Sequence, residues 1–564
     1  MADPEVGLPR APTDQIIAGN RPEIKDEDEK NITLDHSESS SSHTTDSTTW
    51  EYLTFDTALP RPSYLSSSID VYDNGKAPPT EPDLKDYESP FNWSPKRKSF
   101  ITWLSCIATT VTAYCAGSYT SGDAQMEAYW GVSHVAITVG VTTFTTGFAI
   151  APMVLAPFSE INGRRPMFVI TGICFVILQL CCAVTRSYPG MLVARFFTGC
   201  FSSTFSTMVG GVVSDIYHAD DRNTAMALFS GAALFGTGLG PMISGFIAAH
   251  TTWRWIFYLQ VITCGVVQIL VVLFFKETRG SVLLSRKAKK LNEYYDALEA
   301  AGFGGLDVPA EGEPDKMVSQ RLRWKVKADE ERVSLSRMIG ISLYRPFNLL
   351  FTEPVVFFFS LWVAFAWAVL YLTFGAVPLV LTTSHHFDLQ QSGAAFSAIS
   401  IAAILSTIIA IVGERLAKRR FPQYSSSPEG RLYIACTLGL FLPIGLFWFG
   451  WTSFPSDAWI LPVLAVGCAT MGIFAIYLAV FNYLADTYHR YASSALAAQS
   501  CCRNLLGGVF PLITDQMFDA MTFQGAGSFL GGIGCLLAIV PFVLLIWGPK
   551  IRARSKFASE IMEK

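Results

Sequence analysis

Long apolar runs separated by short polar loops fill the chain from residue 98 to residue 547. Each run is close to the roughly 20 residues that an α-helix needs to cross the hydrocarbon core of a bilayer. Because backbone groups in lipid must bond within their own segment, we expect these runs to be transmembrane helices. The twelve predicted spans are 99–120, 135–157, 167–185, 190–213, 224–249, 255–275, 354–380, 391–413, 431–451, 458–484, 492–515 and 526–547. The pattern therefore predicts an all-α membrane protein.

The polar stretches around these spans divide the chain into five regions. Residues 1–97 lack the apolar surface needed to offset chain entropy, so we expect a disordered cytoplasmic tail. The spans then form six-helix groups at 98–275 and 351–547, separated by a partly helical cytoplasmic linker at 276–350, and 548–564 forms a second cytoplasmic tail. A six-plus-six layout predicts two pseudo-symmetric bundles with a binding cavity between them near the bilayer midplane.

Lysine and arginine are concentrated in alternate loops, which predicts the orientation of the helices. The basic residues of these loops and of the last tail are Lys96, Arg97, Lys98, Arg164, Arg165, Arg222, Arg415, Lys418, Arg419, Arg420, Arg490, Lys550, Arg552, Arg554 and Lys556. The loops at 382–390, 452–457 and 516–525 contain none. Both termini are therefore expected in the cytoplasm, which requires an even number of spans. In the linker, the apolar pattern at 285–301 favours an amphipathic helix on the inner leaflet.

Composition supports this interpretation and argues against other classes of protein. Apolar residues make up 51% of the chain and charged residues only 16%, whereas soluble domains carry about 25% charged residues. The net charge of −4 gives no sign of a nucleic-acid partner. The twelve cysteines all lie in predicted spans, so we interpret them as small packing residues and expect no metal site. No phosphate loop, catalytic triad or haem signature occurs, so we expect neither an enzyme nor a cofactor.

The loop after the second span carries a compact group of charges. Residues 156–166 read Ala-Pro-Phe-Ser-Glu-Ile-Asn-Gly-Arg-Arg-Pro. Gly163 permits a tight turn between Glu160 and the pair Arg164 and Arg165. Anchoring of the helix ends by positive charge is one interpretation of this group.

The same loop also resembles the signature of the major facilitator superfamily, Gly-x-Leu-x-Asp-Arg-x-Gly-Arg-Arg. Here Ala replaces the first Gly, Glu replaces the Asp and Ile replaces the first Arg. The resemblance implies the twelve-helix fold of that family and a cytoplasmic gate. In that gate, Glu160 is the acidic latch, Arg164 is its basic partner and Asp215 completes the relay.

Two arginines lie inside predicted spans, where a charge is costly and marks a functional candidate. Arg195 lies in a segment similar to the superfamily's span-4 signature, Leu-x-x-x-Arg-x-x-x-Gly, which implies a role in proton transfer. Snorkelling of Arg195 to the outer surface is the alternative. Arg503 lies near the middle of span 11, where coupling or gating competes with a structural bond to backbone carbonyls. Asp123 is the acidic candidate for proton coupling, if span 1 extends outward to meet Arg195; a solvated loop acid is the alternative.

The fifth span contains glycines at helical spacing around a proline. Gly236, Gly240, Pro241 and Gly245 allow close helix approach and a bend. This element resembles the Gly-x-x-x-Gly-Pro-x-x-x-Gly motif of antiporters in the superfamily. The alternative interpretation of the same residues is simple close packing of helices, without a role in transport.

Several shorter stretches narrow the family. The segments at 89–94, 252–257 and 486–495 look like those of fungal twelve-span drug:proton antiporters, the multidrug and polyamine exporter group. Glu277-Thr278 after span 6 is similar to the Pro-Glu-Thr of the drug exporters, with Lys276 in place of the proline. The resemblance covers residues 87–557.

These features lead to one functional hypothesis. We expect proton-coupled efflux of small hydrophobic drugs, toxins or metabolites across a fungal membrane by alternating access. The plasma membrane is the expected location and the vacuolar membrane the alternative. Aromatic faces suit stacking with such compounds. The residues expected to line the substrate cavity are Phe365, Trp367, Tyr371, Phe374, Tyr477, Phe481 and Asn482.

Two other functions remain open at this point. One is export of polyamines or other organic cations, although no carboxylate is evident at the midplane to receive them. The other is a non-transporting membrane sensor on the same fold. The expected partners are the substrate, protons and the lipid bilayer, and the expected oligomeric state is a monomer.

Overall fold

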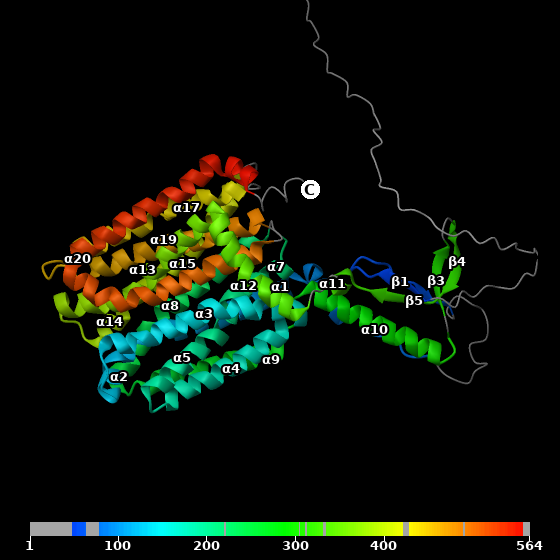
Figure 1. Ribbon diagram of the computed structural model, residues 1–564, viewed down its shortest axis with the longest axis horizontal. Helices are drawn as coiled ribbons and strands as arrows, with labels where there is room; N and C mark the ends of the chain where they lie inside the picture. Colours follow the sequence, from blue (N-terminus) through cyan, green and yellow to red (C-terminus); the bar gives the residue numbers. More distant parts are fainter. Residues whose placement is uncertain are drawn as a thin grey trace, which may run out of the picture. The chain divides into compact units, whose positions relative to one another are not determined.

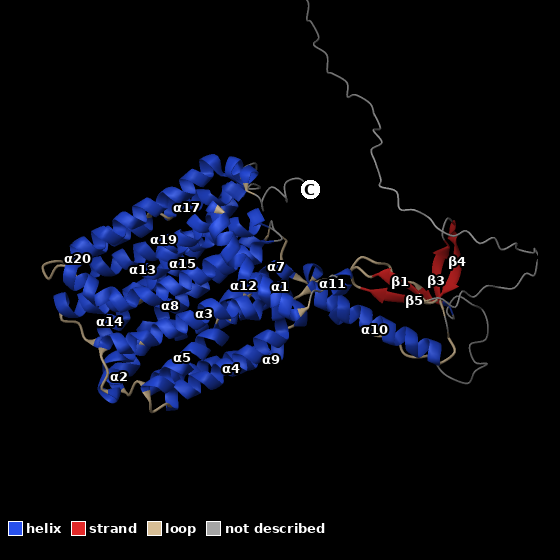
Figure 2. Ribbon diagram, in the orientation of Figure 1, coloured by secondary structure: helices blue, strands red, loops and turns tan. Residues whose placement is uncertain are grey.

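The computed structural model describes residues 48–63, 78–218, 221–303, 305–310, 313–330, 334–420, 428–488 and 491–555. Most of this part is helical, and the few strands lie outside the long helices (Figure 1, Figure 2). Eleven candidate spans occur within the described residues. They correspond in order to the predicted ones, with the last helix covering two predictions. The predicted all-α membrane fold is therefore confirmed.

The first six spans form the N-terminal half, and their ends follow from local chemistry. The first helix begins after Ser94, whose side chain accepts the Arg97 amide, and Pro95 occupies its first position. The third helix ends at Gly163, whose φ of 100° favours glycine. The elements are α1 (Pro95–Gly117), η4 (Thr120–Gly122), α2 (Asp123–Trp130), α3 (His134–Asn162), α4 (Arg164–Val184), α5 (Tyr188–Ser202), α6 (Thr204–Thr207), α7 (Val209–Ile216), α8 (Arg222–His250) and α9 (Arg254–Phe274).

The remaining spans form the C-terminal half. The eighth span of the chain begins with a capping box, in which the Asp388 side chain accepts a hydrogen bond from the Gln391 backbone amide. The elements are α12 (Leu335–Thr352), α13 (Pro354–His385), α14 (Leu389–Ala395), α15 (Ser397–Arg420), η5 (Pro428–Arg431), α17 (Leu432–Leu438), α18 (Phe441–Trp451), α19 (Ile460–Tyr488) and α20 (Ala492–Arg554). Of these, α12 precedes the seventh span.

The helix α20 contains two spans. Its 63 residues would extend roughly 95 Å as one straight helix, which is about three times the hydrocarbon thickness of a bilayer. Thr522 interrupts it with φ 63° and ψ 168°, which are not helical values. The interruption lies between the predicted spans 492–515 and 526–547, so the predicted number of twelve spans agrees with the structure.

The two halves meet along two pairs of spans. The helix α3 packs against α20, and α8 packs against α14 and α15. Within the N-terminal half, α8 also packs along α1, and α4 lies against α9. A cavity also lies between helices of the two halves.

The segment before the first span is not uniformly disordered, and this corrects the expectation for residues 1–97. The strand β1 (Thr49–Tyr52) pairs in parallel with β5 (Leu322–Lys325) of the linker, and β2 (Arg61–Pro62) pairs with β3 (Leu306–Ala310), which pairs with β4 (Glu313–Gln320). Leu53 is buried in a small core together with residues of the linker. The average composition of the tail is polar and did not indicate this local apolar contact. Residues 1–47 and 64–77 of the predicted tail lie outside the described residues.

The linker helix expected at 285–301 is present as α10 (Gly280–Ala300), but its apolar face has a different partner. Leu291, Tyr295 and Leu298 pack with Leu53 and Trp324 in a small core of their own. The face is therefore covered by protein, whereas a position on the inner leaflet was expected. The linker also contains α11 (Lys327–Glu330).

A charged contact joins the start of the linker to the segment before α1. The Lys276 ammonium donates a hydrogen bond to the Asp86 carboxylate at 3.0 Å, which lowers the pKa of Asp86. Both side chains are more than half exposed, so the pair contributes little to stability.

Candidate functional site

A cavity of about 580 Å³ lies between the two halves. Its walls come from the second and fourth spans on one side and from the tenth and eleventh on the other. The lining residues are Pro152, Ala156, Glu160, Arg164, Ser206, Thr207, Met208, Gly210, Gly211, Ser214, Asp215, Arg222, Arg279, Tyr477, Phe481, Ala485, Ala492, Ser493, Leu496, Ala497, Gln499, Ser500 and Arg503. The volume is in the range of small-molecule sites. We call the end that carries Arg164, Arg165 and Arg222 the basic end.

Arg503 lies at the inner part of this cavity, held between aromatic rings. Its Cζ atom is 4.4 Å from the Trp367 ring centroid and 4.9 Å from that of Tyr477. The residue is only 2% exposed, and its Nε and Nη1 atoms have no hydrogen-bond partner among the described residues. Its Nη2 atom makes one long contact to Ser500 Oγ, at 3.5 Å. Arg503 follows the start of α20 by 11 residues, which is about 16 Å along the helix.

The predicted cavity residues occupy different positions. Tyr477 and Phe481 line the cavity, and they pack with Phe229 of the other half. Trp367 contacts both Arg503 and Tyr477, the latter with ring centroids 5.2 Å apart. Tyr371 stacks edge-on against Phe374. Phe365, Tyr371 and Phe374 are buried, and none of the three is among the residues that line the cavity.

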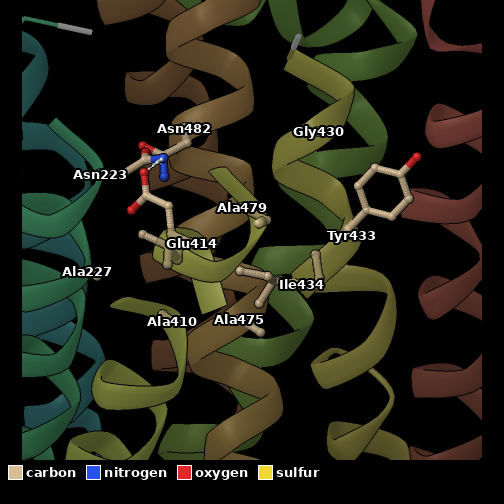
Figure 3. A pocket seen from close by; sticks show the side chains of 13 residues that line it. Asn223, Ala227, Ala410, Glu414, Gly430, Tyr433, Ile434, Ala475, Ala479 and Asn482 are labelled. Carbon is tan, nitrogen blue, oxygen red and sulfur yellow. Dashed lines mark hydrogen bonds between the residues drawn. The ribbon is translucent and has the colours of Figure 1, made fainter. Parts of the chain in front are cut away.

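Asn482 faces a second pocket of about 530 Å³, formed by the fifth, eighth, ninth and tenth spans. Figure 3 shows its side chain beside Asn223 and Glu414, with Tyr433 on the far side. The Asn223 amide donates to the Glu414 carboxylate at 2.8 Å, and Lys418 pairs with the same oxygen at 2.9 Å. Asn482 and Phe481 are adjacent in sequence and line different pockets, because neighbouring residues of a helix point in different directions.

At the basic end, Asp215 connects three segments of the chain. Its carboxylate pairs with Arg164 Nε at 3.1 Å and with Arg279 Nη1 at 3.1 Å. Arg164 also donates to Ser159 Oγ at 2.6 Å. The side chains of Arg164 and Asp215 are both less than a tenth exposed, so this ion pair is poorly screened by water. The structure thus joins Arg164 to Asp215, and the role of this pair in a gate stays a prediction.

Glu277 is the residue of this cluster that sequence reasoning did not assign. Its carboxylate accepts the backbone amides of Arg164 at 2.8 Å and Arg165 at 3.2 Å. It also accepts the amides of Thr278 and Arg279. The first turn of α4 has no side-chain cap of its own, so this distant carboxylate satisfies amides that would otherwise lack partners. The only sequence signal was the Glu-Thr pair after span 6.

The other predicted gate residues differ in their contacts. Gly163 lies against Glu277, so a side chain at this position would collide with that carboxylate. Arg165 is exposed, and its side chain contacts the Val272 carbonyl at 3.4 Å. Glu160 lines the cavity mouth, and within the described residues no hydrogen bond or ion pair joins it to Arg164. In this conformation Asp215, not Glu160, is the partner of Arg164.

Contacts join the halves at both ends of the cavity, and at the basic end Arg222 of α8 pairs with Asp486 of α19 at 2.6 Å. Thr142 Oγ1 donates to the Gly508 carbonyl at 2.8 Å, which joins α3 to α20 just beyond Arg503. Farther out, His134 Nδ1 is 2.6 Å from Glu127 and its Nε2 is 3.4 Å from Asp515 of the other half. The halves are therefore in contact on both sides of the cavity.

Arg195 lies on the side opposite the basic end, in a fully buried position. Its Cζ atom is 4.6 Å from the Tyr119 ring centroid and 4.4 Å from that of Phe144, and its Nε donates to the Gly140 carbonyl at 3.3 Å. The Nη1 and Nη2 atoms have no partner among the described residues, and neither has Oδ1 of Asp123. Asp123 is also buried, in the first turn of α2. Two of the three predicted coupling residues, Arg195 and Asp123, are therefore shielded from water, although no ion pair joins them in the described part of the chain.

The glycine motif of the fifth span allows close helix approach. A Cβ atom on Gly240 would lie 2.8 Å from Gly117 backbone of α1, and one on Gly245 would lie 3.1 Å from Gly393 of α14. Gly236 lies against the Thr110 carbonyl of α1. The motif thus packs α8 against its own half and against the other half. Pro241 lies within α8.

Known proteins resemble this chain over most of its length. The family model described as Major Facilitator Superfamily matches residues 99–511. The multidrug transporter FLR2 of Candida glabrata is 30% identical over 84% of this chain and 78% of its own length. The major facilitator superfamily multidrug transporter mdrA of Aspergillus fumigatus is 31% identical over 84% and 75%, and the efflux pump atB of Aspergillus terreus is 34% identical over 73% and 84%.

A solved structure shows the same fold. The proton:xylose symporter XylE superposes with a TM-score of 0.56 at 14% sequence identity, over 80% of this chain and 97% of its own. The paired halves, the central cavity and the matched sequence families lead to one conclusion. The chain belongs to the major facilitator superfamily and is a multi-pass membrane protein.

Proposed function

We propose that this protein exports small hydrophobic compounds from a fungal cell by alternating access, in exchange for protons. The observation that carries the proposal is the cavity between the halves, whose lining runs from the charged residues of the basic end to Tyr477, Phe481 and Arg503. Relatives of this chain are named as multidrug transporters and efflux pumps. Because basic loops stay in the cytoplasm, the basic end of the cavity faces the cytosol in this proposal.

Substrate binding and proton binding use different parts of the molecule in this proposal. The substrate binds beside Tyr477 and Phe481, and the side opposite the basic end holds Arg195 and Asp123, both buried. When the halves rock to open the far side, Asp123 gains access to external protons. In the conformation described here the carboxyl is buried without an ion pair to Arg195, which favours its protonated form. Release of the proton to the cytosol therefore requires a step that brings the Arg195 guanidinium within pairing distance.

The proton gradient is sufficient for concentrative export. One proton crossing about 100 mV gains roughly 2.3 kcal/mol, and one pH unit adds about 1.4 kcal/mol. The sum sustains a substrate gradient of several hundredfold. We place the protein in the plasma membrane, with the vacuolar membrane as the alternative, because either location moves substrate out of the cytosol.

The test uses inside-out membrane vesicles that contain the full-length protein. Labelled drugs and polyamines are offered with an acidic interior, with and without a protonophore. Accumulation that collapses with protonophore supports proton-coupled export. Asp123→Asn is expected to abolish accumulation while leaving exchange of substrate at equilibrium, and Arg286→Gln, an exposed arginine of α10, serves as the control. Equilibration without accumulation in the wild type contradicts the coupling, and no movement of any compound favours a sensor.

A further inference from the structure

The charges around the central cavity leave one deep cation without a counter-ion. Asp215 pairs with Arg164 and Arg279, and Arg222 pairs with Asp486 at 2.6 Å. The remaining acidic residue of the lining, Glu160, lies at the mouth near the end of α3. No carboxylate lies within ion-pairing distance of Arg503 in the described part of the chain, so the inner cavity has a net positive charge.

The surroundings of Arg503 keep this charge buried without neutralising it. The rings of Trp367 and Tyr477 lie against the guanidinium and offset part of its desolvation by cation–π contact. The Nε and Nη1 donors nevertheless lack acceptors. A buried donor without an acceptor is unfavourable, and more so when it carries a charge. The guanidinium therefore has two donors available for hydrogen bonds to an anionic oxygen of a ligand.

The adjoining wall is suited to the apolar part of such a ligand. Met208, Tyr477, Phe481 and Leu496 line the same cavity as Arg503, and Tyr477 contacts Arg503 directly. Gln499 adds an unpaired amide oxygen, Oε1, and Ser500 adds a hydroxyl. An apolar body with one acidic group matches this combination better than a polyamine, whose charges would be repelled by the unpaired guanidinium.

We propose that Arg503 binds the anionic group of the substrate, so that the transported compounds include hydrophobic organic acids with a carboxylate. This inference rests on the proposed export function and adds its substrate class. It replaces a coupling role for Arg503 with a recognition role: the guanidinium donates hydrogen bonds to the carboxylate, and Trp367 and Tyr477 hold the guanidinium in position.

The test is a binding measurement on the purified full-length protein in detergent, without any proton gradient. The probes are 1-naphthoic acid and its uncharged isostere 1-naphthamide, with decanoic acid and decanamide as an aliphatic pair. Quenching of tryptophan fluorescence reports binding, since Trp367 contacts the proposed site. A charge-assisted hydrogen bond corresponds to a preference for the acid over the amide of about tenfold to a hundredfold.

Three variants separate recognition from a structural role. Arg503→Gln is expected to remove the preference for the acid and to leave the binding of the amide within about threefold of the wild type. Arg503→Lys keeps the charge and retains part of the preference, and Arg286→Gln retains all of it.

Equal affinity of the wild-type protein for acid and amide would overturn the inference, as would an unchanged preference in Arg503→Gln or failure of the wild type to bind either acid. Because the measurement uses no gradient, loss of proton-driven transport in vesicles would contradict the proposed coupling alone.

Discussion

Replacement of Glu277 by alanine tests whether the cluster at the basic end depends on this carboxylate. The change removes the acceptor of the Arg164 and Arg165 amides at the start of α4. Hydrogen bonds to a charged group contribute roughly 1.5–3 kcal/mol each, and Glu277 is only 5% exposed, so water does not readily replace it. We expect the two lost bonds to destabilise the N-terminal half by at least about 3 kcal/mol.

The matched control is Glu160→Ala, which removes an acidic side chain at the same end of the molecule. Glu160 is partly exposed and has no ion pair with Arg164 in the described structure, so we expect a change within about 0.5 kcal/mol. The assay is thermal unfolding of the purified proteins in one detergent, followed by intrinsic fluorescence. If the half unfolds as a unit of its size, Glu277→Ala lowers the Tm by roughly 6–12 °C. Equal shifts for the two variants, or a larger shift for Glu160→Ala, would refute the reasoning.

Three further changes test the packing, the kink and the tail. Gly240→Ala places a Cβ 2.8 Å from the Gly117 backbone, so we expect a Tm decrease and loss of vesicle transport, whereas Gly265→Ala, with open space around it, should preserve both. Thr522→Gly removes a side chain from a backbone conformation that favours glycine, and it should stabilise the protein by about 1 kcal/mol in the same assay; a decrease would contradict strain at this kink. Leu53→Ala leaves a gap in the small core shared with α10 and should destabilise that core by about 2–4 kcal/mol, seen as faster proteolysis of the linker in the full-length protein. Trp50→Ala, at an exposed position of the same strand, is its control and should leave the cleavage rate unchanged.

The sequence alone predicted the main features of the fold because they depend on local properties of the chain. The length and apolarity of each run specify a membrane helix wherever the run occurs, since a bilayer imposes the same requirement on every segment. The turn at Gly163 and the close packing at Gly240 were also predictable, because a positive φ favours glycine and small residues four apart let helices approach closely. The helix α20 also agrees with the prediction, because the interruption at Thr522 divides it into the two predicted spans.

Only the tertiary structure decided which of the charged residues meet. Glu160 and Glu277 are both acidic residues at the basic end, but Glu277, more than a hundred residues from Arg164 in sequence, caps α4 and Glu160 does not. Likewise, Arg503 was evident as a buried cation, whereas its contact with Trp367 and its unpaired donors depend on how α13 and α20 pack. Residues that are distant in sequence are brought together by the packing of whole helices. The pattern of apolar and polar positions along the chain does not specify how close two such residues are in space.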